Sequence, residues 1–176
     1  MPKNKKNKKS KSSDNEKEKT ISRHICFSFS HSLDRCVEIK NKNFFFTNRV
    51  PLKQIREYRA IIDKTFHDWS TKTIEQLGQG EVCYPVKINE VRNGIVKVFR
   101  FVGYKDEWTK QNIQDLDIYK FKITKQIRMF GVVKRNVVHV LLYDIWHLID
   151  PDKDKNFPIL DNRACTWCLK SCNKGK

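Results

Sequence analysis

The segment YKFKITKQIRMFGVVKRNVVHVLLYDIWH, residues 119–147, decides the fold that the sequence predicts. Apolar and polar residues alternate along 119–124 and again along 126–131, and 137–146 is a mainly apolar run. Alternation with a period of two is typical of β-strands. Lys-Arg-Asn at 134–136 interrupts the pattern and suits a tight turn. The segment therefore predicts three consecutive strands that pair in an antiparallel sheet.

The turn sets a register for the last two of these strands. If Arg135 and Asn136 are the two turn residues, antiparallel pairing places Arg128, His139 and Tyr143 on one face of the sheet. A slip of one residue would separate these three side chains. The predicted pairs are Val132 with His139, Phe130 with Leu141, and Arg128 with Tyr143.

A helical hairpin is predicted upstream, over 51–69 and a shorter stretch that ends near Gly78. Pro51 suits the first turn of the longer helix. We expect Ser70 or Thr71 to cap the shorter helix and Gly78 to end it. One apolar stripe with a helical period lies on the longer helix, and its members are Leu52, Ile55, Ile62, Phe66 and Trp69.

The remaining stretches predict more strands. Residues 25–30 alternate as a strand does, and 83–91 and 94–103 read as extended segments, with the better strand at about 95–102. Phe44 to Phe46 are expected to be buried under a loop. The predicted fold is therefore α+β, a helical hairpin packed on an antiparallel β-sheet.

The chain has 176 residues and a formal net charge of +16. Residues 1–20 hold eight lysines, three acidic residues and no apolar side chain after Met1, which predicts a disordered basic tail. The other 156 residues still carry +11, which favours a polyanionic partner such as RNA. A solvated basic surface or an acidic protein partner would also account for the charge. We expect a single domain over 21–160 and a basic, cysteine-containing tail over 161–176.

The compartment follows from what the sequence lacks. It has no apolar run near the ~18 residues of a membrane span, and the lysine-rich start has no apolar core of a signal peptide. We therefore expect a cytoplasmic protein without a membrane partner. Its six cysteines are expected to be mostly thiols or metal ligands, with Cys26, Cys36 and Cys83 packing as small apolar side chains.

The predicted sheet carries a set of side chains suited to RNA cleavage: Arg128, Lys122, His147, His139 and Tyr143. Cleavage through the ribose 2′-hydroxyl needs a base, a positive charge at the phosphate and an acid for the leaving oxygen. Lys122 and Arg128 can hold the phosphate, and His139 or His147 can move protons. The alternative for each histidine alone is a packing role in the sheet.

The same segment resembles the C-terminal sheet of the RelE/ParE toxin superfamily. Tyr119 to Ile123, then Ile127 to Met129, then Val137 to His147 match its pattern of basic and aliphatic positions, a turn and a terminal histidine. A strand, a helical hairpin and this sheet also follow the family's order. The resemblance implies a metal-independent mRNA endoribonuclease, dependent on the ribosome or free, that an antitoxin neutralises. It implies phosphate-binding and transition-state roles for Lys122 and Arg128, and an acid/base role for His147. The basic tail, a strand at 95–102 and the C-terminal cysteines depart from the family, and ParE-like members poison gyrase instead.

Other basic residues are expected to contact nucleic acid. Aromatic residues interleaved with lysine and arginine can stack bases and bind phosphates together. Phe99 and Phe101 are expected to share one face beside Lys97, near Tyr104 and Trp108. Core packing explains these aromatic residues equally well. The predicted nucleic-acid contacts are Lys97, Arg100, Lys105, Lys120, Lys125 and Arg135.

Two stretches suggest metal binding. The spacing of Cys165, Cys168 and Cys172 can hold Zn²⁺, and the alternative is three free thiols in a tail. The aspartates of 144–158 could hold a divalent metal together with a histidine, but lysines between them favour a plain turn. A fourth zinc ligand would come from His147, Cys83 or Cys36.

The leading hypothesis is a metal-independent endoribonuclease of RelE-like toxin type that acts on mRNA. The first alternative is a non-catalytic nucleic-acid-binding or ribosome-associated protein, with or without zinc at its C-terminus. The second is a toxin or inhibitor that binds an acidic protein.

Overall fold

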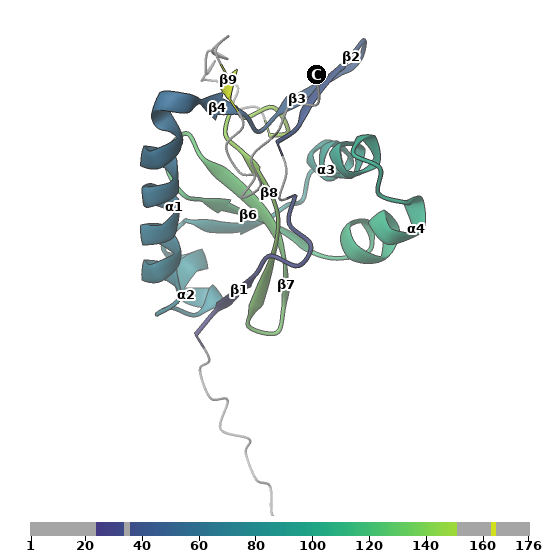
Figure 1. The fold of residues 1–176 in the computed structure, drawn as a ribbon. Coiled ribbons are helices and arrows are strands. Elements are labelled where there is room, and N and C mark those ends of the chain that lie inside the picture. Colours follow the sequence, from purple (N-terminus) through teal and green to yellow (C-terminus); the bar gives the residue numbers. More distant parts are fainter. Residues whose placement is uncertain (1–23, 34–35, 151–162, 165–176) are drawn as a thin grey trace, which may run out of the picture.

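A five-stranded sheet with helices on both faces forms the centre of the computed structural model, which describes residues 24–33, 36–150 and 163–164 (Figure 1). The strand order is β1-β8-β7-β6-β5. Neighbouring strands are antiparallel except β1, which runs parallel to β8. The predicted α+β class is therefore confirmed. The strands are β1 Cys26–Ser28, β5 Cys83–Pro85, β6 Ile118–Lys122, β7 Arg128–Lys134 and β8 Val137–Asp144.

The hairpin of β7 and β8 turns at Arg135 and Asn136, as predicted, and Arg135 takes the positive φ of 56° that such a turn requires. Val132 pairs with His139, also as predicted. A β-bulge between Phe130 and Gly131 then shifts the register by one residue. The predicted pairs of Phe130 with Leu141 and Arg128 with Tyr143 are wrong. Phe130 pairs with Leu142, Met129 with Tyr143, and Arg128 with Asp144.

The predicted helical hairpin is confirmed, and it covers one face of the sheet (Figure 1). Thr73 caps the shorter helix, in place of the expected Ser70 or Thr71, because its Oγ1 accepts from the Gln76 N–H while the Gln76 side chain accepts from the Thr73 N–H. The bounds are Leu52–Gln54 for the short helix η1, Ile55–Trp69 for α1 and Ile74–Gln79 for α2. The core on this side contains Tyr58, Ile62, Trp69, Leu77, Phe121, Met129 and Val138.

Helices also cover the opposite face, and here the prediction of a strand at 95–102 is wrong. That stretch belongs to α3, Asn89–Phe101. Val91, Ile95 and Val98 recur every three or four residues and are buried, so the helical period outweighs the strand preference of these β-branched residues. The helices α4, Asp106–Thr109, and η2, Lys110–Gln114, follow. This core includes Phe99, Ile113, Ile118, Phe130, Val132, Leu141 and Leu142.

A separate hairpin of β2, Glu38–Asn41, and β3, Phe44–Thr47, lies above α3 in Figure 1. Phe46 is fully buried as expected, but within a strand and not under a loop. Strand β4, Val50–Pro51, pairs with β9, Arg163–Ala164.

Three further predictions concern membrane spans, the cysteines and the two tails. Among the described residues, none of the helices has the length and apolar character needed to cross a bilayer. Cys36 is disulfide-bonded, contrary to the expectation of a packed thiol, whereas Cys26 and Cys83 are free. The basic tail 1–20 and the cysteines Cys165, Cys168 and Cys172 lie outside the described residues.

Candidate nucleic-acid interface

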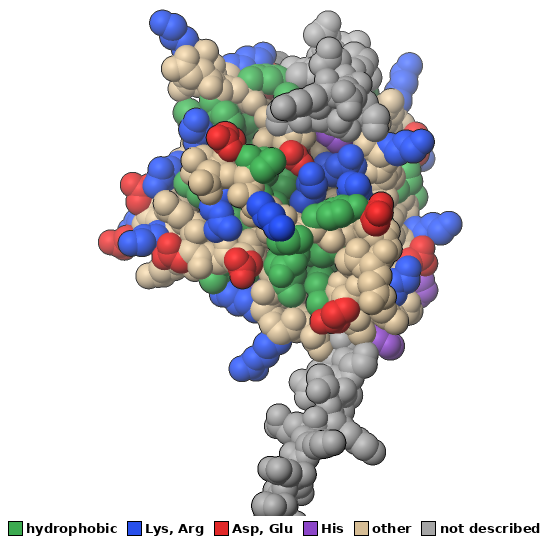
Figure 2. Space-filling model, turned by 180° about the vertical axis from the view of Figure 1, so that it is seen from behind, with side chains coloured by type: hydrophobic (Ala, Val, Ile, Leu, Met, Phe, Trp, Pro, Cys, Tyr) green, Lys and Arg blue, Asp and Glu red, His purple; other side chains and the backbone are tan. Residues whose placement is uncertain are grey.

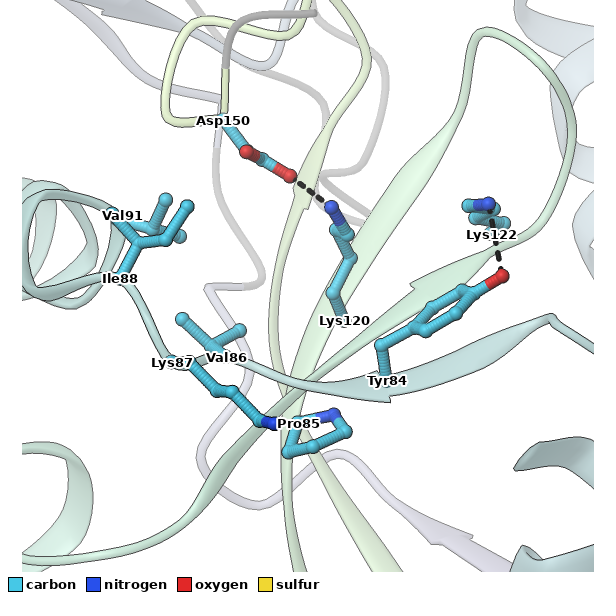
Figure 3. Close-up of a pocket in the computed structure, with 9 residues that line it drawn as sticks. All are labelled: Tyr84, Pro85, Val86, Lys87, Ile88, Val91, Lys120, Lys122 and Asp150. Atoms are coloured by element: carbon cyan, nitrogen blue, oxygen red, sulfur yellow. Dashed lines mark hydrogen bonds and ion pairs between the residues drawn. The ribbon is translucent and has the colours of Figure 1, made fainter.

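A pocket of about 430 Å³ lies between β5, β6 and the beginning of α3 (Figure 3). Val86, Ile88 and Val91 lie on one side of the pocket, Tyr84 and Lys122 lie on the opposite side, and Lys87 extends from the same segment as the apolar residues (Figure 3). The apolar lining residues are Pro85, Val86, Ile88 and Val91, and the polar ones are Tyr84, Lys87, Lys120, Lys122 and Asp150.

The period of two along β6 places the pocket lysines. Phe121 points into the core under α1, so Lys120 and Lys122 point to the opposite face. Tyr84 of β5 pairs with Lys120 and therefore lies on the same face. The segment from Val86 to Val91 leaves β5 and enters α3, which supplies the apolar wall. The pocket thus follows from two strands and the connection to one helix.

The polar groups of the pocket contact one another. Lys120 forms an ion pair with Asp150. The Lys122 Nζ donates a hydrogen bond of 3.1 Å to the Tyr84 hydroxyl and lies 4.5 Å from the centre of its ring. The Tyr84 hydroxyl in turn donates to the Glu81 carbonyl at 2.6 Å. Three lysines against one carboxylate leave the lining positive, so it favours an anion.

Two of the five predicted catalytic residues, Arg128 and His147, are buried near this end of the sheet. The Arg128 Nη1 donates to the Thr124 carbonyl at 2.5 Å, and the His147 Nε2 lies 3.0 Å from the Gln126 carbonyl. Both therefore bind the connection between β6 and β7. Lys122 pairs with Arg128 across the strands and is the predicted catalytic residue that reaches the pocket.

His139 and Tyr143 are not part of this arrangement. His139 pairs with Val132, about 13 Å along β7 from Arg128 at about 3.3 Å per residue. Its ring stacks on His31 at 5.4 Å, and burial, followed by the charge of Lys134, lowers the His139 pKa. Tyr143 packs in the core under α1, where burial and then the nearby charge of Asp63 raise its pKa. The structure therefore does not bring the five residues together.

The predicted nucleic-acid contacts are spread over several surfaces. Lys120 lines the pocket, and Lys97 lies over the Phe44 ring. Arg100 is paired with Asp106 through a 2.6 Å contact between Nε and Oδ1. The others, Lys105, Lys125 and Arg135, are exposed at separate positions in the chain.

Of the polar pocket residues, Tyr84, Lys87 and Asp150 are absent from the predicted RNA contacts, and Tyr84 and Lys87 were not singled out at all. They belong to the stretch CYPVKINEV, which was expected to be extended. Tyr84 lies on β5, which pairs with the predicted basic strand, and Lys87 follows β5 by two residues.

The aspartates of 144–158, for which the sequence favours a turn over a metal site, include Asp144, whose role the structure shows. This side chain is fully buried and accepts hydrogen bonds from the N–H groups of Leu148, Ile149 and Asp150. Burial raises the Asp144 pKa to about 6. Its carboxyl group thus shapes the chain after β8. Within the described parts of the chain, no group of three or more histidine, cysteine or acidic side chains is placed to hold a metal ion. The predicted zinc cysteines are not among those residues.

Comparison with known protein families gives one match. Residues 28–174 match the family described as "Uncharacterised protein UU032", and the chain belongs to that family. Neither the curated proteins nor the solved structures contain a match to the chain.

Proposed function

We propose that this member of the UU032 family binds single-stranded RNA, and that the pocket beside β5 and β6 holds one nucleotide of the strand. The observation that carries the proposal is the meeting of lysines and an aromatic ring on one side with an apolar wall on the other. A nucleotide has a part that suits each side of the pocket: a phosphate for the lysines and a flat, largely apolar base for the ring and the apolar wall. Single-stranded nucleic acid offers both to a protein, because its bases are not held in a duplex.

The charge of the whole chain supports the same ligand. A formal charge of +16 attracts a phosphate backbone at long range. From behind, lysine and arginine side chains gather around a central patch of hydrophobic side chains, with acidic side chains interspersed (Figure 2). In this proposal Lys87, Lys120 and Lys122 bind phosphate, and Tyr84 with the apolar wall contacts the base.

We propose binding and not cleavage, because the two histidines that could transfer a proton lie outside the pocket. His147 is buried against the Gln126 carbonyl, and His139 stands beside His31 at the far end of β8. Neither histidine lines the pocket.

A metal-independent endoribonuclease of RelE-like type, with an antitoxin and the ribosome as partners, is the second candidate. One observation favours it: Lys122 places a positive charge 3.1 Å from the hydroxyl of Tyr84 at the pocket. Such a pair offers a charge for a phosphate and a group that carries a proton.

Fluorescence anisotropy with a labelled single-stranded RNA tests the proposal over a range of salt concentrations. We expect Lys87→Ala and Lys122→Ala each to weaken binding about two- to fivefold. Each variant should also reduce the salt slope by about 0.7, because each lysine neutralises one phosphate of a single strand. Lys64→Ala is the matched control, because Lys64 is an exposed lysine of α1, on the other face of the sheet. Equal weakening in all three variants would contradict a specific site.

The same variants, incubated with mRNA in EDTA with and without ribosomes, test the second candidate. Cleavage that Lys122→Ala abolishes would favour the endoribonuclease. Intact RNA together with salt-dependent binding would contradict the endoribonuclease and support the RNA-binding function.

A further inference from the structure

A second aromatic surface lies at the far end of α3. The rings of Phe44, in β3, and Phe101, the last residue of α3, are nearly parallel, at 6° and 6.0 Å between centres. Phe101 is 50% exposed, and the Lys97 Nζ lies 5.7 Å from the centre of the Phe44 ring. We infer that Phe44, Phe101 and Lys97 form a stacking platform for a second base of the same RNA strand. This inference rests on the proposed RNA-binding function.

Phe101 lies outside the buried core, because it stacks on Phe44 and stays half exposed. The aromatic residues that pack the core here are Phe99, Tyr104 and Trp108, whose rings contact one another at 4.4 to 5.5 Å. The sequence placed Phe99 and Phe101 on one face of a strand. In an α-helix, residues two positions apart point about 200° away from each other around the axis. Phe99 is therefore fully buried while Phe101 points outward.

The surroundings of the platform favour a nucleic acid over an apolar partner. Lys97 of α3 lies over the Phe44 ring and is exposed, and Lys42, in the turn of the β2–β3 hairpin two residues before Phe44, is also exposed. Arg100 is also exposed, although it is paired with Asp106. An aromatic ring with cations beside it can stack on a base and bind the adjoining phosphates. A duplex hides the faces of its bases, so the platform fits a single strand.

The platform and the pocket are joined by one row of α3. Asn89, Asn93, Lys97 and Phe101 follow one another every four residues and share one exposed side of the helix. The row begins beside the pocket residue Ile88 and ends at the platform, a length of about 18 Å at 1.5 Å per residue. A short, extended RNA strand spans that length.

The test compares two ligands with the same phosphates: a single-stranded oligonucleotide and an abasic strand of equal length. We expect Phe101→Ala to weaken binding of the base-containing strand at least about fivefold and to leave binding of the abasic strand unchanged. Phe101→Trp keeps a stacking surface and should restore the affinity. Phe29→Ala is the matched control, since Phe29 is also 50% exposed but packs beside Phe66 of α1. Thermal unfolding of each variant confirms that it is folded.

The outcomes separate the platform from the pocket. Loss of binding in Lys122→Ala with full binding in Phe101→Ala would overturn the platform and keep the proposed function. Equal weakening of both strands by Phe101→Ala, or equal weakening by Phe29→Ala, would also overturn the platform. No binding of either strand by the unaltered protein would overturn both proposals.

Discussion

Arg128 and His147 bind consecutive parts of one connection, the loop between β6 and β7. Arg128 donates to the Thr124 carbonyl and His147 contacts the Gln126 carbonyl. This loop follows directly on Lys122, so its conformation fixes the end of the strand that carries the pocket lysines. Both residues thereby help to fix the end of β6.

We expect Arg128→Ala to lower the free energy of unfolding by about 1–3 kcal/mol, because a partly buried carbonyl loses its donor and a buried side chain is removed. Urea unfolding measures the change. Lys125→Ala, at an exposed position of the same loop, is the control and should change stability little. Abolished RNA binding with unchanged stability would instead make Arg128 a ligand-binding residue.

Asp144 predicts how stability depends on pH. Its folded pKa of about 6 lies above the ordinary value of 3.8, so between these values the folded protein holds a proton that the unfolded chain releases. The stabilising contribution is complete below about pH 4 and is lost as the pH rises to about 6. The total loss is about 3 kcal/mol at about 1.4 kcal/mol per pKa unit.

Urea unfolding of the protein and of Asp144→Asn at pH 4, 5, 6 and 7 measures this contribution. The variant lacks the titrating group, so the stability difference between the two proteins should change across this range. Asp117→Asn, at an exposed aspartate, is the control. A constant difference for Asp144→Asn at every pH would contradict the prediction.

Among the elements, the bulge between β7 and β8, whose extra residue is Leu141 of β8, has the widest effect on the candidate site. It moves Tyr143 away from Arg128 and His139, so these three cannot share a face. Gly131 lies at the bulge, where an added Cβ would be 3.0 Å from the His139 carbonyl oxygen and 3.1 Å from a methyl group of Val138. The close approach of β8 at this point requires glycine.

We therefore expect Gly131→Ala to destabilise the protein by about 1–3 kcal/mol through overpacking. Gly78→Ala in α2 is the control, because its nearest neighbour would be 4.0 Å away and alanine favours a helix. Urea unfolding compares the two. A Gly131→Ala variant as stable as Gly78→Ala would show that the bulge adapts.

Local patterns in the sequence predict the elements well where the period is clear. Helix α1 and the turn at Arg135 are as predicted, because an amphipathic stripe and a tight turn are local features. The prediction of a strand at 95–102 is wrong. β-branched residues occur in strands and in helices, and here the packing of one apolar side against the sheet stabilises the helix α3. The bulge was not predictable, because its extra residue, Leu141, lies in a mainly apolar run where no alternation marks a shift of register.

At the scale of the whole molecule, the pocket joins segments far apart in the sequence. Lys120 and Lys122 were predicted from the alternation in one strand. Tyr84, Lys87 and Asp150 join them only through tertiary structure, some 30 residues away on either side. The basic character of the site was therefore predictable, whereas its shape was not.

Charge also gives a prediction for the whole chain. Removing residues 1–20 takes away eight lysines and leaves a chain of net charge +11. We expect the shortened chain still to bind single-stranded RNA, with a smaller salt slope, because the pocket and the platform lie beyond residue 20. Anisotropy titrations at several salt concentrations compare the two chains. Complete loss of binding would place the RNA contacts in the first 20 residues.

The parallel pairing of β1 with β8 has a consequence for synthesis on the ribosome. Cys26 pairs with Val137, which is translated 111 residues later. At about 5–20 residues per second, the first strand waits about 5–20 s for its neighbour. During that time its edge is open on the nascent chain, and translation that stops before residue 137 leaves it open permanently. The sheet is therefore complete only after translation has passed β8, although β1 is its first strand in the sequence.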